Sequence, residues 1–229
     1  MRLEHEGTLL IMAGVRIHQL GVGSCSGLTS LTLGTESTAK FIAITHYHLM
    51  VNPLMMARVR DELRTVPENA SWTELEQLPY LSACIAEGNW LSFGVTARVC
   101  RIAPDETLRY KGFAIPPGTP VSMTSLYAHT DEGIFPDPWT FNPDRWLGPE
   151  GVRRRKYQMA FNKGGRICIG INLAHAEMFL VIAAAARYDM DLFETDASDV
   201  EFQHDYQVAF PKMASKGIRA TVKGKAAMT

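Results

Sequence analysis

Residues 161–170 of the chain read FNKGGRICIG, and the strongest helical pattern, INLAHAEMFLVIAAAARYDM, follows at once over residues 171–190. Cys168 therefore lies in a glycine-rich loop that ends where an apolar helix begins. Glycines let a backbone turn tightly and approach a flat ligand closely. The free N–H groups at a helix start stabilise a thiolate, and Arg166 adds a nearby positive charge. From these residues alone, Cys168 is a ligand, a reactive nucleophile or an inert buried thiol.

The composition fits an ordinary globular protein. The 229 residues and 25.4 kDa are enough for one large domain or two small ones. With 46% hydrophobic and 21% charged residues, the chain is neither disordered nor fibrous. The net charge of -1 offers no bulk attraction to nucleic acid, which is not expected as a partner. The cysteines form no CxxC pair, which argues against a structural zinc site and favours a reducing compartment: they are Cys25, Cys84, Cys100 and Cys168.

The pattern of apolar residues predicts helices first, then short strands, then a further helix and strands. This order predicts a mixed α+β fold that is mainly helical. Residues 14–30 are rich in glycine and serine and predict a loop. Residues 129–151 predict an ordered meander, because a linker would not carry Trp139, Phe141 and Trp146. The expected helices cover residues 33–51, 53–65, 80–91 (weakened by Gly88) and 171–190, and the expected strands lie within 96–103, 107–115, 119–126, 206–210 and 218–222.

The order of residue types in the cysteine loop, FxxGxRxCxG, resembles the haem-binding signature of the cytochrome P450 family. Its fixed positions are Phe161, Gly164, Arg166, Cys168 and Gly170. The resemblance implies a haem b cofactor (iron protoporphyrin IX) with the Cys168 thiolate as axial ligand of the iron. It also implies that Phe161 packs near the sulfur and that Arg166 meets a haem propionate.

Other stretches resemble the family in the same order. Residues 34–38, GTEST, are similar to its oxygen-side helix motif, in which Glu36 and Ser37 would relay protons as an acid and an alcohol. Taken alone, the same residues read as a helix cap. Arg101 falls where the family places a second propionate-binding arginine. His129 either reaches a propionate or is an ordinary surface or loop histidine. Residues 141–146, FNPDRW, resemble the family's meander motif, whose basic residue here is Arg145.

One position departs from the family pattern. The family carries E-x-x-R and joins that pair to the meander arginine in a buried network. Here Glu87 is present, but Trp90 stands where the arginine is expected. Indole has one donor and no charge, so Glu87 is left with Arg145 alone as a charged partner. Breaking a buried charge network by removing one partner costs ~3–5 kcal/mol. We therefore predict impaired folding or haem retention.

The resemblance covers about residues 31–222 and corresponds to the C-terminal half of the family's fold, of the fungal microsomal type. We expect residues 1–30 to be an atypical or inserted segment, poorly ordered, and residues 31–229 to be a partial catalytic domain. Family members of this type are anchored in the endoplasmic reticulum with a cytosolic domain, and we expect no such anchor in this sequence. The cellular location of the chain is left open.

The implied activity is a haem-thiolate monooxygenase that hydroxylates or epoxidises a small lipophilic substrate, as in secondary-metabolite biosynthesis. Its expected partners are dioxygen and an electron donor of the NADPH–cytochrome reductase type. The basic run at residues 153–156 suits docking of an acidic donor, or is a solvated charge run. The alternative is a truncated, catalytically inactive remnant of the family without the E-x-x-R arginine and the N-terminal half.

Overall fold

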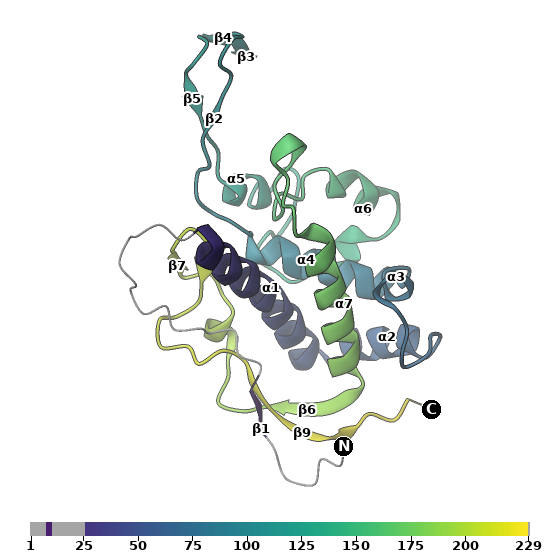
Figure 1. The fold of residues 1–229 in the computed structure, drawn as a ribbon. Helices are drawn as coiled ribbons and strands as arrows, with labels where there is room; N and C mark the ends of the chain where they lie inside the picture. The colour runs from purple at the N-terminus through teal and green to yellow at the C-terminus, as the bar shows by residue number, and fades with distance from the viewer. Residues whose placement is uncertain (1–7, 11–25, 229) are drawn as a thin grey trace.

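A computed structural model describes residues 8–10 and 26–228 of the chain (Figure 1). The predicted class, a mainly helical α+β fold, is confirmed. The helices are α1 (Ser26–Val51), α2 (Pro53–Leu63), α3 (Trp72–Leu75), α4 (Pro79–Ser92), α5 (Ser125–His129), α6 (Gly148–Arg155) and α7 (Ile171–Ala186), with 3-10 turns η1 (Pro143–Trp146), η2 (Gly164–Arg166) and η3 (Ala197–Asp199). The strands are β1 (Thr8–Leu10), β2 (Arg101–Ile102), β3 (Leu108–Tyr110), β4 (Phe113–Ile115), β5 (Pro120–Val121), β6 (Tyr188–Leu192), β7 (His204–Asp205), β8 (Ala209–Phe210) and β9 (Arg219–Lys225).

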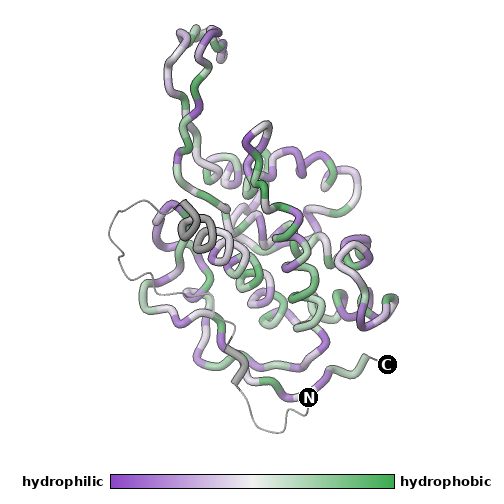
Figure 2. Tube along the Cα trace, viewed as in Figure 1, coloured by the Kyte–Doolittle hydropathy of each residue, from purple (hydrophilic) through white to green (hydrophobic). Residues whose placement is uncertain are grey.

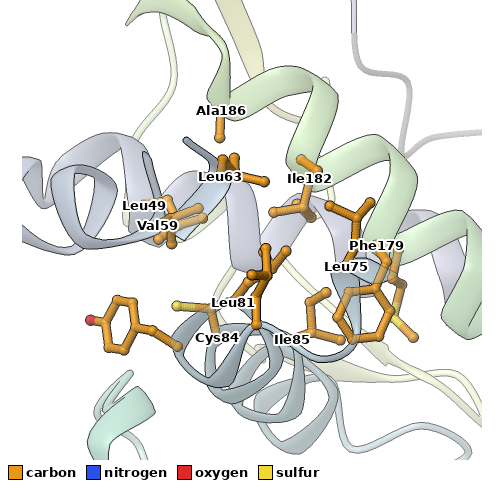
Figure 3. Packing of buried hydrophobic residues seen from close by; sticks show 14 of the residues in the cluster. Leu49, Val59, Leu63, Leu75, Leu81, Cys84, Ile85, Phe179, Ile182 and Ala186 are labelled. Atoms are coloured by element: carbon orange, nitrogen blue, oxygen red, sulfur yellow. The ribbon is translucent and has the colours of Figure 1, made fainter. Parts of the chain in front are cut away.

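The main core lies where α1, α2, α4 and α7 meet (Figure 3). One side chain from each helix illustrates it: Leu49, Leu63, Leu81 and Ile182 are each at most 1% exposed. Burying a side chain of this size contributes ~1.5–3 kcal/mol. In Figure 2, hydrophobic (green) and hydrophilic (purple) residues alternate along these helices, as expected for helices with one face in the core. The core therefore fixes the relative positions of α1 and α7, which carry the predicted site.

Helix α4 approaches α1 very closely at Gly88. A Cβ atom on Gly88 would lie 1.8 Å from Thr45 Oγ1, so the Thr45 side chain would have to move. The Thr45 hydroxyl in turn donates to the carbonyl of Phe41 at 2.8 Å. Gly88 weakens the helical pattern of the sequence, and this contact gives the reason for a glycine at that position.

Small antiparallel sheets flank the helices. Strand β9 pairs with β1 on one side and β6 on the other, with a register shift at Asp189/Met190. The pairs β2–β5 and β3–β4 follow one another along a long two-stranded arm that projects from the helical body (Figure 1). Its base leads directly into α5, so this arm begins beside the site described below.

Two of the helices begin at a side chain that caps the first turn. Asn52 caps α2 by accepting from the N–H of Met55 at 3.2 Å, with Pro53 in the first turn. Ser71 caps α3 in a capping box with Glu74.

Two helix boundaries differ from the expectation. Helix α1 begins at Ser26, not at residue 33, so the expected domain boundary after residue 30 falls inside a continuous helix. Helix α7 ends at Ala186, because residues 188–192 pair with β9 instead of continuing the helix. Of the expected loop over residues 14–30, residues 14–25 lie outside the described residues.

Buried histidines make the fold sensitive to acid. Burial lowers the pKa of His46, His48 and His129 to about 4, from an ordinary value of 6.5. The unfolded chain takes up these protons as the pH falls through 6.5, whereas the folded chain resists until about 4. The stability is therefore present above pH 6.5 and is lost progressively below it. Of these three histidines, His46 should contribute most to this loss of stability. In the described part of the chain, neither of its ring nitrogens has a hydrogen-bond partner.

We expect His46→Phe to flatten the acid side of the stability curve. Phenylalanine keeps a planar ring in the core and removes buried nitrogens that would otherwise be protonated on unfolding. Removing an unsatisfied buried polar group is worth ~1–3 kcal/mol, so the variant should also gain stability near neutral pH. Urea unfolding at a series of pH values measures both effects. An acid side as steep as that of the wild type would show that His46 does not contribute.

Candidate functional site

A groove of about 1270 Å³ opens between α1, α7, the cysteine loop and the base of the projecting arm. Helix α1 contributes one wall through residues that include Ser37, Thr38 and Phe41. Helix α7 contributes the other through Leu173, Ala174, Glu177 and Val181, and the arm contributes Arg101, Val121, Ser122 and Met123. Segments separated by more than a hundred residues in the sequence thus line one space.

The cysteine loop is held by its own backbone. The N–H of Cys168 donates to the carbonyl of Phe161 at 2.9 Å, which closes the loop on itself. Gly164 has a φ of +73°, a conformation that favours glycine, and it begins the tight turn η2. Gly170 is the N-cap of α7, and a Cβ added there would lie 3.9 Å from Cys168 Sγ. The loop therefore presents an exposed thiol at the start of an apolar helix.

Phe161 anchors the loop to the helices. Its ring meets the ring of Phe41 edge to face at 5.6 Å and that of His175 at 5.3 Å. Aromatic pairs of this kind contribute ~0.5–1.5 kcal/mol beyond their buried area. Because Phe41 belongs to α1 and His175 to α7, this one side chain holds the thiol loop between the two walls of the groove.

Most of the predicted site residues come together in this groove, and some do not. Ser37, Arg101, Phe161, Arg166, Cys168 and Gly170 all line it. Gly164 shapes the loop but is not among the described residues that line the groove. Glu36 also lies outside that lining. It is half-buried on α1, and burial raises the pKa of its carboxyl.

Several lining residues were not singled out from the sequence. Thr38 follows Gly34 by one helical turn, and its hydroxyl donates to the Gly34 carbonyl at 3.1 Å. The contribution of α7 to the groove could have been predicted from the sequence. The helix is apolar on nearly every face, which predicts that a second face, outside the main core, also contacts an apolar partner. Leu173 is 65% exposed and Val181 40% exposed, so that second apolar face is the one turned to the groove.

The residues of the groove fit a haem group. A haem is a flat apolar macrocycle with two carboxylates and a metal that accepts a thiolate. The groove offers apolar walls from α1 and α7, the exposed thiol of Cys168, and the guanidinium groups of Arg101 and Arg166. Its volume exceeds the ~300–1,000 Å³ of ordinary small-molecule sites, so it has room for a large flat ligand.

His129 is not available to a propionate, and it is not a surface residue. Its side chain is 0% exposed and stacks on Trp90 with the ring centroids 4.1 Å apart. Nδ1 contacts the Trp90 carbonyl at 2.9 Å, and Nε2 accepts from the N–H of Met159 at 2.9 Å. Since Nε2 accepts, the proton lies on Nδ1, and the ring is neutral with both nitrogens used. Both interpretations of His129 from the sequence are therefore wrong.

Glu87 and Arg145 form a buried ion pair away from the groove. Arg145 Nε lies 3.4 Å from Glu87 Oε1, and the two side chains are 5% and 0% exposed. The Glu87 carboxylate also accepts from the N–H of Asn142 at 2.7 Å and from Trp146 Nε1 at 2.5 Å. Burial raises the pKa of Glu87 to about 7, while the Arg145 charge and these donors lower it.

Trp90 stands at the position of the expected arginine, but its indole nitrogen does not contact the Glu87 carboxylate. Its indole N–H donates to the Pro138 carbonyl at 3.3 Å, and its ring packs with Phe135 and Trp146 in a buried aromatic cluster. The tryptophan thus replaces a charged contact by an apolar one, and Trp146 supplies the missing donor to Glu87. The carboxylate faces a single positive charge, that of Arg145, as expected from the sequence, and it also accepts two hydrogen bonds that the sequence did not predict.

The basic run at the end of α6 is partly structural. Arg154 donates to the carbonyls of Ile134 and Arg145, at 3.4 and 3.1 Å, and so braces the meander. Arg153 pairs with Glu150 at 2.7 Å on the surface. The expectation of a solvated run of charges therefore describes only part of residues 153–156.

The fold and the groove are those of a class of proteins in which helices bind a cofactor next to a cysteine in a loop. The chain belongs to the cytochrome P450 family, whose model matches residues 26–206. Cytochrome P450 monooxygenase sdnE of Sordaria araneosa is 44% identical over 201 residues, which make up 83% of this chain and 39% of that protein. Cytochrome P450 monooxygenase pbrB of Penicillium brasilianum is 40% identical over 205 residues, or 86% of this chain and 40% of that protein.

The chain spans about two fifths of the length of these curated relatives. Haem is the cofactor that the family implies. Among the helices of the described residues, none is long and apolar enough to cross a membrane.

Proposed function

We propose that this chain is the haem-binding part of a cytochrome P450 monooxygenase. The observation that carries the proposal is the groove itself, in which Ser37, Arg101, Phe161, Arg166 and Cys168 meet from distant parts of the sequence. The second cavity, between α1, α2 and β6, contains two arginines, Arg60 and Arg64, but no cysteine.

Cys168 would hold the haem iron through its thiolate. The loop bond to Phe161 and the edge contacts of that ring fix the sulfur relative to α1 and α7. Arg101 and Arg166 would bind the propionates, since a guanidinium matches a carboxylate in two parallel hydrogen bonds. When bound, haem supplies the oxidising chemistry with dioxygen and two electrons. The protein's task is to hold it, to exclude water and to deliver protons.

Ser37 and Glu36 would deliver those protons from α1. Ser37 lines the groove, whereas Glu36, the residue before it on α1, is half-buried and lies outside the lining. Because burial raises the pKa of Glu36, its carboxyl keeps a proton at higher pH than an exposed glutamate. In the proposed relay the acid supplies the proton and the neighbouring alcohol passes it into the groove.

The apolar walls favour a small lipophilic substrate, consistent with a role in secondary metabolism. The electron donor would be of the NADPH–cytochrome reductase type. The exposed Arg153, near the cysteine loop in the sequence, suits an acidic docking face on such a donor.

The direct test is a carbon monoxide difference spectrum of the chain after haem loading and reduction. We expect a Soret band of the thiolate-ligated type. A spectrum of free haem or of a nitrogen-ligated haem would contradict the proposal.

A second candidate function is haem binding without turnover. It is favoured by Trp90, which leaves Glu87 with one charged partner where the family pattern provides two. Substrate-dependent NADPH consumption with a reductase separates the two functions: a thiolate-type spectrum with no such consumption supports the second.

A further inference from the structure

The amine of Lys40 connects α1 to the C-terminal hairpin that β7 and β8 form. Its Nζ donates a hydrogen bond to the carbonyl of Ala209, which lies on β8 and 169 residues further along the chain. Lys40 belongs to α1, and its neighbours Ala39 and Phe41 both line the groove. Figure 1 shows β7 beside the first turns of α1. The Lys40 contact therefore joins one wall of the groove to this hairpin.

The same hairpin holds the segment that follows α4. The N–H of Thr96 donates to the carbonyl of Gln207 at 2.8 Å, and the Thr96 hydroxyl donates to Asp205 Oδ1 at 2.5 Å. Val95 pairs with Val208 in an isolated antiparallel bridge. Because Val95 is 45% exposed and lines the groove, these contacts connect the hairpin to a second part of the groove wall.

The Lys40 amine loses hydration in this position. Lysines are seldom buried, because an ammonium group removed from water needs strong partners. Burial lowers the pKa of Lys40 to about 7, from an ordinary value of 10.5, and the negative charge of Asp205 on β7 acts in the opposite direction. The other titratable side chains on the adjoining parts of the chain are Glu36, Arg98, His204 and Tyr206. Glu36 lies one helical turn before Lys40 on α1, and Arg98 is exposed. Successive side chains of a strand point to opposite faces, so His204 and Tyr206 lie on the other face of the hairpin from Asp205.

The direction of this pKa shift determines the pH at which the hairpin is held most firmly. While the hairpin is in place, the Lys40 amine loses its proton near pH 7. Once the hairpin is released, the amine is solvated and keeps its proton up to the ordinary value of 10.5. Release of the hairpin therefore takes up a proton, and the held state becomes more stable as the pH rises above 7.

We propose that Lys40 is a positioning residue of the groove, which holds the β7–β8 hairpin and the segment 94–97 in place while its amine is neutral and releases them when it is protonated. Gly94 and Ala97 also line the groove, so release would loosen one side of it. If the groove has the proposed function, this side is where a bulky substrate would gain room. The hold on the hairpin needs neither haem nor turnover, so the test below and the haem test fail independently.

Hydrogen–deuterium exchange of the full chain, without added haem, tests the proposal. Exchange rates are corrected for the intrinsic effect of pH and followed in the peptides that contain the amides of Thr96 and Ala97. In the wild type, the protection of these amides should rise about tenfold between pH 7 and 8.5, as the two pKa values of Lys40 require. Lys40→Met keeps the length of the side chain but removes the titrating amine. Its protection should not vary with pH and should be lower than that of the wild type at pH 8.5.

Asp205→Asn gives a second reading that does not alter Lys40. The Asp205 charge raises the pKa of Lys40, so its removal should move the pH profile of protection to lower pH, while the amide oxygen still accepts from Thr96. The matched control is Lys216→Met, which replaces an exposed lysine beyond the hairpin and should exchange as the wild type does.

Three results would overturn the proposal. The first is a wild-type protection that does not vary with pH, and the second is the same variation in Lys40→Met. The third is an equal change in the peptides of α7, which would show that the whole fold opens and not the hairpin. The wild-type and Asp205→Asn profiles decide the matter even if Lys40→Met does not fold.

Discussion

Replacing Cys168 with serine is expected to abolish the thiolate-type Soret band of the haem-loaded, reduced chain in carbon monoxide. A serine hydroxyl is not ionised near neutral pH and binds iron more weakly than a thiolate does, so the spectrum of a thiolate-ligated haem should be lost. The apolar walls and both arginines of the groove remain in this variant. Haem should therefore still associate, more weakly, with an altered spectrum.

The matched control is Cys100→Ser, which removes a second exposed thiol from the chain. Cys100 immediately precedes Arg101 but does not belong to the groove lining. Its loss should leave the thiolate band unchanged. If Cys168→Ser kept the band, or if Cys100→Ser removed it, the ligand would not be Cys168. Circular dichroism of both variants shows whether the helical body is still folded.

The long helices α1, α2, α4 and α7 could be predicted because each carries local signals, such as Asn52 and Pro53 at the start of α2. The short helices α3, α5 and α6 were not predicted, and α5 overlaps a stretch that was expected to be a strand. The end of α7 could not be predicted, because residues 188–190 continue an apolar helical pattern and only pairing with β9 makes them a strand. A non-local partner decides that segment, and the sequence around it does not contain the information.

The candidate site could be predicted as a list of residues but not as an arrangement. The loop motif names Cys168 and Arg166, and the structure brings them together with Ser37 and Arg101 through the packing of α1 against α7. His129 was misread because a polar residue in a proline-rich stretch suggests a surface loop. Its burial comes from Trp90, which lies far away in the sequence and supplies both a stacking face and a carbonyl.

The surroundings of Trp90 are a second arrangement that could not be predicted from the sequence. As a replacement for an arginine, it predicts a broken charge network. The structure pairs the Glu87 carboxylate with Arg145, Asn142 and Trp146. The additional hydrogen-bond donor to Glu87 is Trp146, which belongs to the meander. A comparison of one sequence position at a time cannot predict this contact.

Glu87→Ala is expected to lower the free energy of unfolding by ~3–5 kcal/mol, the usual cost of removing one partner from a buried ion pair. Arg145 would keep its hydrogen bonds to the carbonyls of Pro136, Asp137 and Thr140, at 2.9, 3.1 and 3.0 Å, but its buried charge would have no counter-ion within the network. The N–H groups of Asn142 and Trp146 would lose their acceptor as well. The part of the meander around Asn142 and Trp146 should therefore loosen before the helical core does.

Glu87→Gln separates charge from shape in the same place. The amide keeps the volume of the side chain and one acceptor oxygen, but its NH2 group must face one of the donors that now meet the carboxylate. We expect a loss of ~1–3 kcal/mol, smaller than that of the alanine variant. Glu106→Gln, an exposed glutamate on the arm, is the matched control and should leave the stability unchanged. Urea unfolding curves measure all three variants. A Glu87→Gln loss as large as that of Glu87→Ala would show that the negative charge stabilises this network, whereas no loss in either would show that Arg145 is held by the backbone carbonyls alone.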